Sequence, residues 1–220
     1  MTMTCRDALT RHWPVFGLRL ASPRLILRPV TDDDLAELVD LALGGIHDPA
    51  GMPFLSPWTD APREELISET LRYHWRARAA SRPDNWSVHF AVRSRGELLG
   101  TQEIAGEQFA VTATVSTGSW LGRRHHGQGF GTEMRAAVLD FAFDHLKATR
   151  AESTAFLDNP SSLAVSRKIG YLPNGDAVQQ RRPGERAVEQ RLVLTPETFR
   201  RPQWAVQVAG LDACRATFGR

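Results

Sequence analysis

Cysteine is scarce in this chain of 220 residues, with only Cys5 and Cys214, which lie near opposite ends. Two cysteines are too few for a disulfide framework, and these two are too far apart in sequence to suggest a metal cluster. We therefore expect two free thiols in a reducing compartment and no bound metal. Long apolar runs are also absent, since no run approaches the ~18 residues that a membrane span requires.

The N-terminus lacks the basic segment followed by an apolar segment that marks a secretory signal peptide. These absences favour a cytoplasmic protein without membrane attachment. Charge of one sign is not in excess either, because 27 Lys and Arg against 25 Asp and Glu give a formal net charge of +2. Such a balance does not favour a polyanionic partner such as DNA, so no nucleic-acid partner is expected.

Hydrophobic periodicity and breaker residues divide the chain into a lead-in over 1–20, one domain over 21–200 and a C-terminal extension over 201–220. The expected element order, β-α-α-β-β-β-α-β-α-β, favours an α/β (α+β) fold with a single mixed sheet flanked by helices. A short helix is also expected to start within 196–200. The expected strands cover 24–30, 87–92, 98–104, parts of 110–121, 151–157 and 191–194, and the expected helices follow residue 31 and cover 62–78, 129–146 and 159–170.

Residues 118–134, GSWLGRRHHGQGFGTEM, carry the most information about function. An apolar strand runs into a loop with glycine at alternate positions, Gly127, Gly129 and Gly131, and a long amphipathic helix follows at once. The glycines let the backbone turn with its amide N–H groups outward. The helix N-terminus adds unpaired donors and the positive end of its dipole. This segment therefore predicts a binding site for an anionic phosphate group.

Several phosphate ligands use a glycine-rich loop. A nucleoside triphosphate P-loop requires a lysine behind its last glycine, and none follows Gly131. A dinucleotide loop requires G-x-G-x-x-G/A, and both registers fail because Thr132 or Met134 occupies the position of the third glycine. A nicotinamide dinucleotide enzyme is therefore disfavoured.

The segment HHGQGFGTEM resembles the pyrophosphate-binding loop of the GNAT (GCN5-related) acyltransferases, whose pattern is Q/R-x-x-G-x-G/A. His126 occupies the usual Gln/Arg position, a departure that the RimJ/RimL-type branch tolerates. A second segment at 157–171, LDNPSSLAVSRKIGY, is similar to the RimL-type N-x-x-S motif, which Asn159 and Ser162 match. The resemblance covers 24–194 and is closest to actinobacterial RimL-like members, including ones thought to use succinyl-CoA.

The resemblance implies a GNAT-like domain whose mixed, mostly antiparallel sheet splays apart between the strand before the loop and the strand at 151–157. Acetyl-CoA or succinyl-CoA would insert there as co-substrate, with its diphosphate on the loop amides. The implied activity is that of an N-acyltransferase, which moves the acyl group to a primary amine of a small molecule or peptide by direct attack in a ternary complex. The implied coenzyme A contacts are Trp120, Leu121, Gly122, His126, Gly127, Gln128, Gly129, Phe130, Gly131, Thr132, Asn159 and Ser162.

Two residues are candidates for catalysis. Ser162, from the N-x-x-S match, would give a proton to the departing thiolate, although a first-turn helix serine can instead bond to the backbone. The tyrosine that many GNAT enzymes carry four residues later is replaced by Ser166. Glu103 lies on a strand where family members often carry a glutamate, so it is either the general base or a solvent-facing side chain. Its neighbour Gln102 points to the opposite face, and alternation does not decide which of the two faces the cleft.

The stretch HDPAGMPFLSPW, between the first two helices, is where GNAT enzymes commonly shape the acceptor pocket. The acceptor-site candidates, whose alternative role is packing alone, are His47, Asp48, Phe54 and Trp58. The adjacent His125 and His126 have no nearby Cys or carboxylate to complete a metal site, and phosphate contact or solvation is expected. A backbone N–H within 120–122 would stabilise the oxyanion.

A non-catalytic acyl-CoA binder or sensor of the same fold is the alternative function, because the family tyrosine is missing and the base is not assured. The sequence leaves open the acceptor amine and the choice between acetyl and succinyl groups. A homo-oligomer, most simply a two-fold dimer, is expected from the tail at 203–218, which carries Trp204, Val206, Val208 and Leu211. Such an apolar segment requires a surface to cover it, either on its own domain or on a neighbour's.

Overall fold

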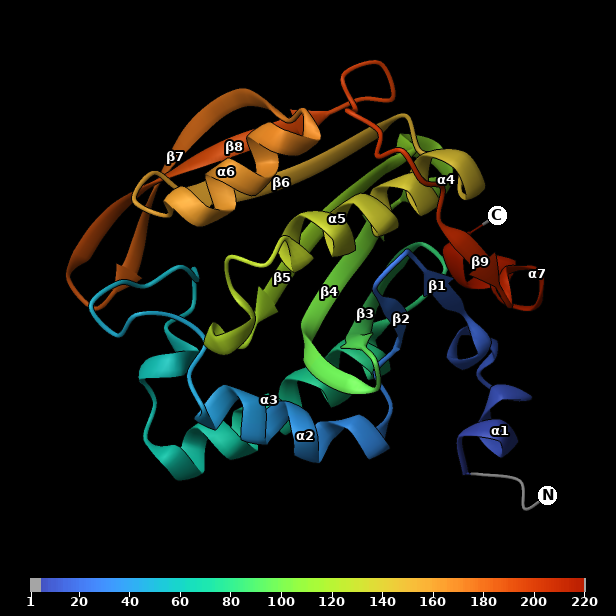
Figure 1. Cartoon of the computed structure of the whole chain (residues 1–220), viewed down its shortest axis with the longest axis horizontal. Coiled ribbons are helices and arrows are strands. Elements are labelled where there is room, and N and C mark those ends of the chain that lie inside the picture. Colours follow the sequence, from blue (N-terminus) through green and yellow to red (C-terminus); the bar gives the residue numbers. More distant parts are fainter. Residues whose placement is uncertain (1–4, 220) are drawn as a thin grey trace.

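Nine strands form one continuous sheet in the computed structural model, which describes residues 5–219 and the side chains from Ala8 onward (Figure 1). The strands are β1 (Arg19–Ala21), β2 (Ile26–Pro29), β3 (Asn85–Ser94), β4 (Glu97–Glu107), β5 (Thr114–Leu121), β6 (Arg150–Phe156), β7 (Leu172–Arg182), β8 (Glu185–Leu194) and β9 (Gln207–Ala209). Their spatial order is β7-β8-β6-β5-β4-β3-β2-β1-β9. Neighbouring strands are antiparallel except β5 and β6, which run parallel. The structure thus confirms a single mixed, mostly antiparallel sheet.

Helices cover both faces of this sheet. They are α1 (Cys5–Thr10), α2 (Asp32–Leu43), α3 (Arg63–Ala80), α4 (Phe109–Thr112), α5 (Phe130–Asp140, continued by a π-helical turn at Phe141–His145), α6 (Pro160–Ile169) and α7 (Leu211–Cys214). Helices α2 and α3 contact each other and cover β3 and β4, while α5 and α6 lie together on the other face (Figure 1). In the described part of the chain, no helix has the length and apolar character needed to cross a membrane.

Helix α6 begins and ends where the sequence signals predict. The side chain of Asn159 caps its N-terminus by accepting a hydrogen bond from the Ser162 amide at 3.1 Å, and Pro160 fixes the first turn. Gly170 closes the C-terminus in the left-handed region, with φ of +106°. Helix α2 also begins at a clear signal, because Thr31 and Asp34 form a reciprocal capping box.

Asp34 also anchors α2 to the sheet. Its carboxylate is fully buried and accepts hydrogen bonds from Arg28 on β2 at 2.6 and 2.7 Å and from Arg93 on β3 at 3.0 Å. Burial alone would raise the pKa of Asp34, but the bonds from Arg28, the Thr31 amide and Arg93 outweigh it and lower the pKa. Asp34 therefore has two roles: it completes the capping box of α2, and its carboxylate links β2 and β3 through Arg28 and Arg93.

Strands β5 and β6 pair over a short stretch only. Residues 114–116 lie opposite residues 150–152, and beyond that point β5 pairs with β4 alone and β6 with β8 alone. Between them, the Ser153 hydroxyl donates to the Thr117 carbonyl at 3.4 Å. The edge of β5 from Thr117 to Leu121 therefore has no strand partner, which is the splay that the family resemblance implies.

The sequence missed several elements at the edges of the sheet. Residues 196–198 form a turn in place of the expected helix. Only the end of β8 was anticipated, whereas β7 and β8 form a long hairpin turning at Gly184. Most of β7 is exposed, so its residues carry no alternation of buried and polar positions that could mark a strand.

The C-terminal tail folds back on its own chain. Strand β9 pairs with β1, and Phe218 is fully buried with its ring 4.9 Å from Trp86 and 5.9 Å from Phe141. Val206 and Leu211 join the same core cluster. The apolar segment that motivated a dimer is thus covered within one chain, while the oligomeric state and the division at residues 20 and 200 stay predictions.

Replacing Asp34 by Asn should destabilise the protein by about 3 kcal/mol at neutral pH, because two arginines lose their buried anion. The folded-state pKa of Asp34 is lowered, so its contribution to stability is complete above its ordinary pKa and is lost as the pH falls through the folded-state value. Urea unfolding should therefore show the difference from wild type shrinking in acid.

The matched control is Glu37→Gln, which removes a half-exposed carboxylate 2.6 Å from Arg93. This variant should lose less than about 1 kcal/mol. Equal losses in the two variants, or a pH-independent loss for Asp34→Asn, would contradict the role given to the buried carboxylate.

Candidate active site

The glycine loop has the backbone that an anion site requires. Gly127 and Gly129 lie in the left-handed region, with φ of +74° and +81°, and Gly129 is the N-cap of α5. Within residues 5–219, the amide N–H groups of 127–132 donate to no carbonyl or side chain. Six free donors therefore converge at the positive end of a helix.

Arg24 and Glu133 brace this loop, and sequence reasoning missed both. The Arg24 Nε lies 2.6 Å from Glu133 Oε2, and its Nη1 donates to the Gln128 carbonyl at 3.0 Å. The Arg24 guanidinium also lies 4.7 Å from the centre of the Phe130 ring. The segment before β2 is thus tied to the loop, and a half-exposed positive charge stands beside it. No local pattern joins residues more than 100 positions apart, so only the fold reveals this pair.

The two loop histidines have different surroundings. His126 is exposed, and its Nε2 lies 3.0 Å from the Leu121 carbonyl, which closes the loop onto β5. His125 is 6% exposed and accepts from Arg124 Nε at 3.1 Å. Burial lowers the pKa of His125. The expectation of phosphate contact or solvation is therefore wrong for His125.

The open edge of β5 presents backbone groups to the space beside β6. The Thr117 carbonyl accepts a hydrogen bond from the Ser153 hydroxyl, and the Leu121 carbonyl lies within hydrogen-bond distance of His126. Both carbonyls therefore point away from β4. Because backbone groups alternate sides along a strand, those of Ser119 share this edge. The Gly122 amide donates to Leu99 at 2.9 Å, so it is not available as an oxyanion donor.

Trp120 sends its indole to the other side of the sheet. The ring centre lies 6.0 Å from that of Trp58, in the α2–α3 half of the molecule. The backbone of Trp120 faces β4, in register with Thr101. Neither the side chain nor the backbone of Trp120 is therefore turned toward the open edge, and the structure does not favour the coenzyme A contact expected of this residue. Leu121 is the better donor within 120–122, because it lies on the open edge.

Ser162 sits in the first turn of α6, on the face of the sheet that α5 also covers. Its side chain is half-buried and its hydroxyl forms no hydrogen bond with the other described residues. Ser166, one turn later, is 1% exposed and accepts from Arg135 Nη1 at 3.1 Å. The structure therefore leaves the Ser162 hydroxyl free for a ligand, whereas that of Ser166 is engaged.

Glu103 points to the side of the sheet that α2 and α3 cover, and Gln102 points to the opposite side. The sequence had left open which of the two residues faces which side. Its Oε1 accepts from Ser87 Oγ at 2.9 Å and lies 3.6 Å from His89 Nε2. Burial raises the pKa of Glu103, and the Ser87 bond opposes this. Gln102 is fully buried on the other face, where Nε2 donates to the Gly118 carbonyl.

The surroundings of Glu103 are uncharged. Burial lowers the pKa of His89 to about 4 and that of His74 to about 3, so both imidazoles are neutral. The Tyr73 ring lies 5.0 Å from that of His89, and burial raises the Tyr73 pKa. A carboxyl group in such a place has a pKa closer to neutrality, as a general base requires.

Gly118 brings Glu103 to the open strand. It lies opposite Glu103 on β5, and a Cβ added there would be 3.0 Å from Glu103 Oε2. Because Gly118 has no side chain, nothing at that position on β5 stands between the Glu103 carboxylate and the opening beside β5. In the described residues, no group of three or more His, Cys, Asp or Glu side chains could hold a metal ion.

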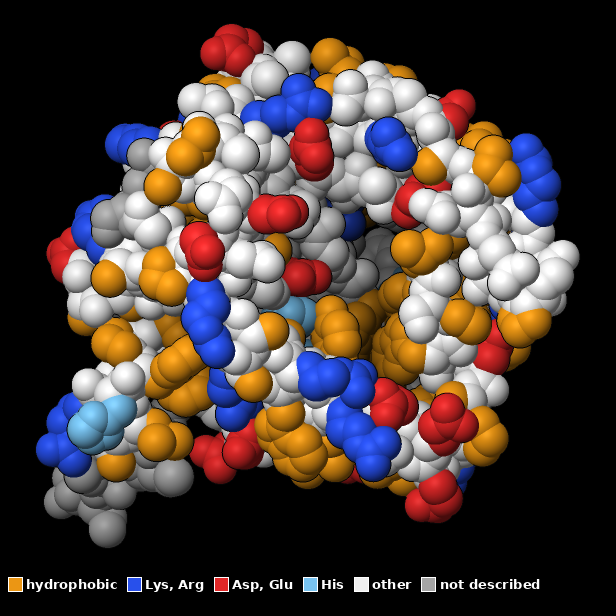
Figure 2. All heavy atoms as spheres, turned by 180° about the vertical axis from the view of Figure 1, so that it is seen from behind, with side chains coloured by type: hydrophobic (Ala, Val, Ile, Leu, Met, Phe, Trp, Pro, Cys, Tyr) orange, Lys and Arg blue, Asp and Glu red, His pale blue; other side chains and the backbone are white. Residues whose placement is uncertain are grey.

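Three of the four acceptor-site candidates come together. The ring centres of His47 and Phe54 are 5.7 Å apart, and Phe54 lies 5.4 Å from Trp58. Asp48 is exposed and points away, with Oδ2 4.0 Å from Arg123 Nη2. Figure 2 shows the reverse face of the molecule, which is hollowed near its middle with hydrophobic side chains gathered along the hollow.

The hairpin β7–β8 holds this loop in place. Arg182 Nε lies 2.6 Å from Asp60 Oδ2, and Arg181 Nη1 donates to the Met52 carbonyl at 3.1 Å. Arg181 also bonds to Asp158, just before α6. Sequence reasoning missed these contacts because the partners lie more than 100 residues apart in the first two cases.

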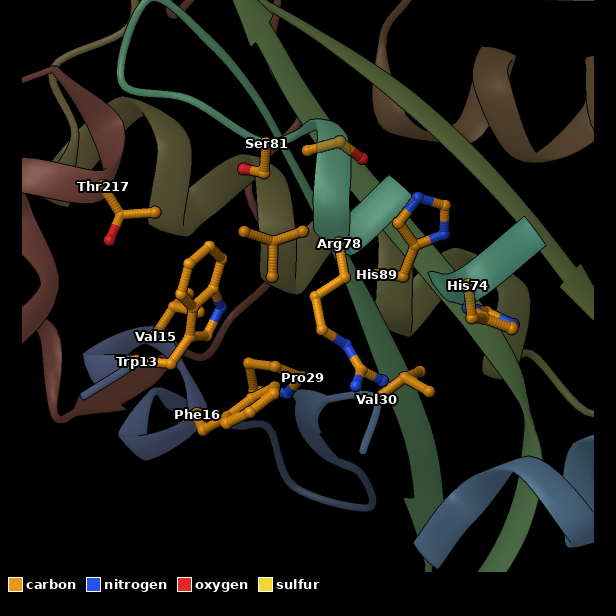
Figure 3. Close-up of a pocket in the computed structure, with 12 residues that line it drawn as sticks. Trp13, Val15, Phe16, Pro29, Val30, His74, Arg78, Ser81, His89 and Thr217 are labelled. Carbon is orange, nitrogen blue, oxygen red and sulfur yellow. The ribbon is translucent and has the colours of Figure 1, made fainter. Parts of the chain in front are cut away.

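A cavity of about 40 Å³ lies beside α3, and its lining includes Ser87 and His89, the neighbours of Glu103. Trp13 and Phe16 from the N-terminal segment lie opposite Arg78 and His74 of α3 (Figure 3). This volume suits one or two water molecules. The cavity does not include the glycine loop or Ser162, so it is not the candidate active site.

Comparison with known proteins matches residues 24–172 to the family model described as acetyltransferase (GNAT) domain. The uncharacterised protein YkkB of Bacillus subtilis is 26% identical over 152 residues, which are 69% of this chain and 84% of YkkB. Mycobacterium smegmatis RimJ, solved with CoA-disulfide, has a TM-score of 0.68 at 22% identity and covers 91% of this chain and 93% of its own.

A structure of the ribosomal L7/L12 α-N-protein acetyltransferase RimL, in complex with coenzyme A, has a TM-score of 0.60 at 18% identity. The match covers 79% of this chain and 95% of the RimL chain. At these identities the two solved structures establish the likeness of fold. The family model spans the glycine loop, the splayed strands and the first turn of α6, and on that ground this chain belongs to the GNAT acetyltransferase domain family.

Proposed function

We propose that this protein is an acyl-CoA-dependent N-acyltransferase that acts on a primary amine. The carrying observation is the row of free amides at 127–132, placed at the N-terminus of α5 and beside the unpaired edge of β5. A ligand whose anionic group lies on those amides can extend along the open edge of β5. If that extension carries amide groups, they can form hydrogen bonds with the backbone of the strand. Coenzyme A has both parts, a diphosphate and a pantetheine arm.

In this arrangement the diphosphate lies on the loop 126–132, with Arg24 as an added cation at its side. The pantetheine amides run along β5 near Leu121, with Asn159 on the α6 side. The thioester then lies between Ser162 on one face and Glu103 on the other. This placement includes ten of the twelve expected contacts, because Gly122 and Trp120 face elsewhere.

The reaction follows from the positions of the two candidates. Glu103 accepts the proton that the neutral amine gives up as its nitrogen attacks. The amine nitrogen then bonds to the acyl carbon, while a backbone N–H on the open edge of β5 stabilises the oxyanion. As the carbon–sulfur bond breaks, the sulfur keeps the electron pair, and the Ser162 hydroxyl donates to it and regains its proton from solvent.

The acceptor enters from the side of His47, Phe54 and Trp58, whose rings form an apolar wall with Trp120. An apolar wall next to a carboxylate suits an amine carried on an apolar stem. The donor is acetyl-CoA or succinyl-CoA, and mass spectrometry of the thioester that copurifies with the protein would distinguish them. The uncharged pocket around Glu103 favours catalysis over passive acyl-CoA binding.

Gly129→Val should abolish coenzyme A binding, because valine resists a φ of +81° and its Cβ would lie 3.3 Å from Arg24 Nη2. Calorimetry with coenzyme A measures the effect. Gly175→Val is the matched control, since Gly175 has a φ of +90° with open space around it. Unchanged affinity in the Gly129 variant would refute the placement of the diphosphate.

Ser162→Ala should lower kcat by roughly 10–10³-fold with little change in coenzyme A affinity, because one proton-transfer contribution is lost. Ser161→Ala, which changes the exposed neighbour, should keep full activity. A Ser162 variant with wild-type kcat would return this serine to a structural role.

Glu103→Gln should reduce kcat/KM by about 10²-fold, as expected for loss of a general base. The base acts deprotonated, so kcat/KM rises as the pH rises through the Glu103 pKa. Ser87→Ala removes the bond that lowers this pKa, so the rise should move to higher pH. A pH profile that Ser87→Ala leaves unmoved would argue against Glu103.

A further inference from the structure

Arg135 of α5 is a buried cation without an anion. Its side chain is 6% exposed, and none of the ion pairs in residues 5–219 involves it. Nη1 donates to Ser166 Oγ at 3.1 Å and Nη2 to Ser119 Oγ at 3.2 Å, while the buried Nε has no partner. Two hydroxyls do not neutralise a guanidinium, so the site keeps a full positive charge.

The guanidinium joins β5, one wall of the splay, to helix α6. Ser119 belongs to the unpaired edge of β5, and Ser166 lies on α6 one turn after Ser162, on the same helix face. The charge is therefore held where β5 and α6 approach each other, on the α5–α6 side of the sheet. That is the side from which a ligand on the glycine loop reaches the opening.

The groups around Arg135 leave this charge uncompensated. Tyr171 is the titratable neighbour, and burial raises its pKa, so it is neutral at physiological pH. Gln102 from β4 is neutral, and Glu133 in the first turn of α5 is paired with Arg24. Arg167 and Lys168 of α6 are exposed and add no negative charge.

An enclosed cation of this kind is costly unless a ligand supplies the anion. Burial lowers the pKa of Arg135, yet a guanidinium stays protonated at any physiological pH. A diphosphate on the loop is already served by six amides and Arg24. In the proposed placement the thioester lies beside Ser162, one turn from the Ser166 hydroxyl that Arg135 contacts, so the negative charge that develops on sulfur is the one that this guanidinium faces.

We propose that Arg135 stabilises the coenzyme A thiolate that leaves during acyl transfer, an inference that rests on the proposed function. The carbon–sulfur bond breaks, sulfur takes the electron pair, and the positive charge fixed between Ser119 and Ser166 balances it. The proton lost by the amine goes to Glu103, and the Ser162 hydroxyl gives its proton to the thiolate that Arg135 has stabilised. This role requires no tyrosine at position 166.

The first test uses the wild-type protein and two ligands. Calorimetry from pH 6 to pH 8.5 compares coenzyme A with desulfo-coenzyme A, which lacks the ionisable thiol. A cation near sulfur lowers the thiol pKa from about 8.5. Between pH 6 and pH 8.5, the affinity for coenzyme A should therefore rise tenfold or more relative to the affinity for the desulfo analogue. Each unit by which the bound thiol pKa is lowered corresponds to a factor of ten in this ratio.

The second test uses Arg135→Met and Arg135→Lys. The methionine variant should lose the pH-dependent gain and about 10²-fold in kcat, with a nearly unchanged KM for acetyl-CoA. The lysine variant should keep most of the gain, because it keeps the charge. If the methionine variant does not fold, the wild-type titration and the lysine variant decide.

The outcomes separate this inference from the proposed function. If wild-type protein binds both ligands with the same pH dependence, or if Arg135→Met keeps the gain, Arg135 serves only to join β5 and α6. In that case the inference is wrong and coenzyme A binding still stands. Failure of both ligands to bind would instead refute the proposed function.

Discussion

The early end of pairing between β5 and β6 is the constraint on which the site depends. A strand edge inside a protein must satisfy its N–H and C=O groups in some other way. Here Ser153 and His126 serve the two ends of the open edge, at Thr117 and Leu121. The stretch between them is available to a ligand. Helices α5 and α6 can approach the gap from one face because no strand fills it.

The sequence predicted the parts of the site that are encoded locally. Gly127 and Gly129 adopt the left-handed conformations that only a glycine-rich loop provides cheaply, and Asn159 caps α6 as its N-cap position requires. These signals lie within a few residues of the structure that they cause. For the same reason, the strand–loop–helix order at 118–134 could be recognised from one sequence.

What the sequence could not predict depends on contacts between distant segments. The alternation of β4 left Glu103 and Gln102 equivalent, and the choice follows from where α3 and α5 pack on the sheet. In the sequence, Arg135 looks like an ordinary polar residue of a helix, although the fold buries it. Hairpin β7–β8 was missed because an exposed strand lacks hydrophobic alternation. Long-range packing decides each of these cases.

The pairing of β9 with β1 also has a consequence for synthesis in the cell. Strand β1 ends at Ala21 and its partner begins at Gln207, so this pair cannot form on a nascent chain until residues 207–209 have left the ribosome. Phe218 enters the core beside Trp86 at the same late stage. Strand β1 therefore lacks this neighbour while residues 22–206 are synthesised. Such pairing between distant segments gives the fold contacts of large sequence separation, which slow folding.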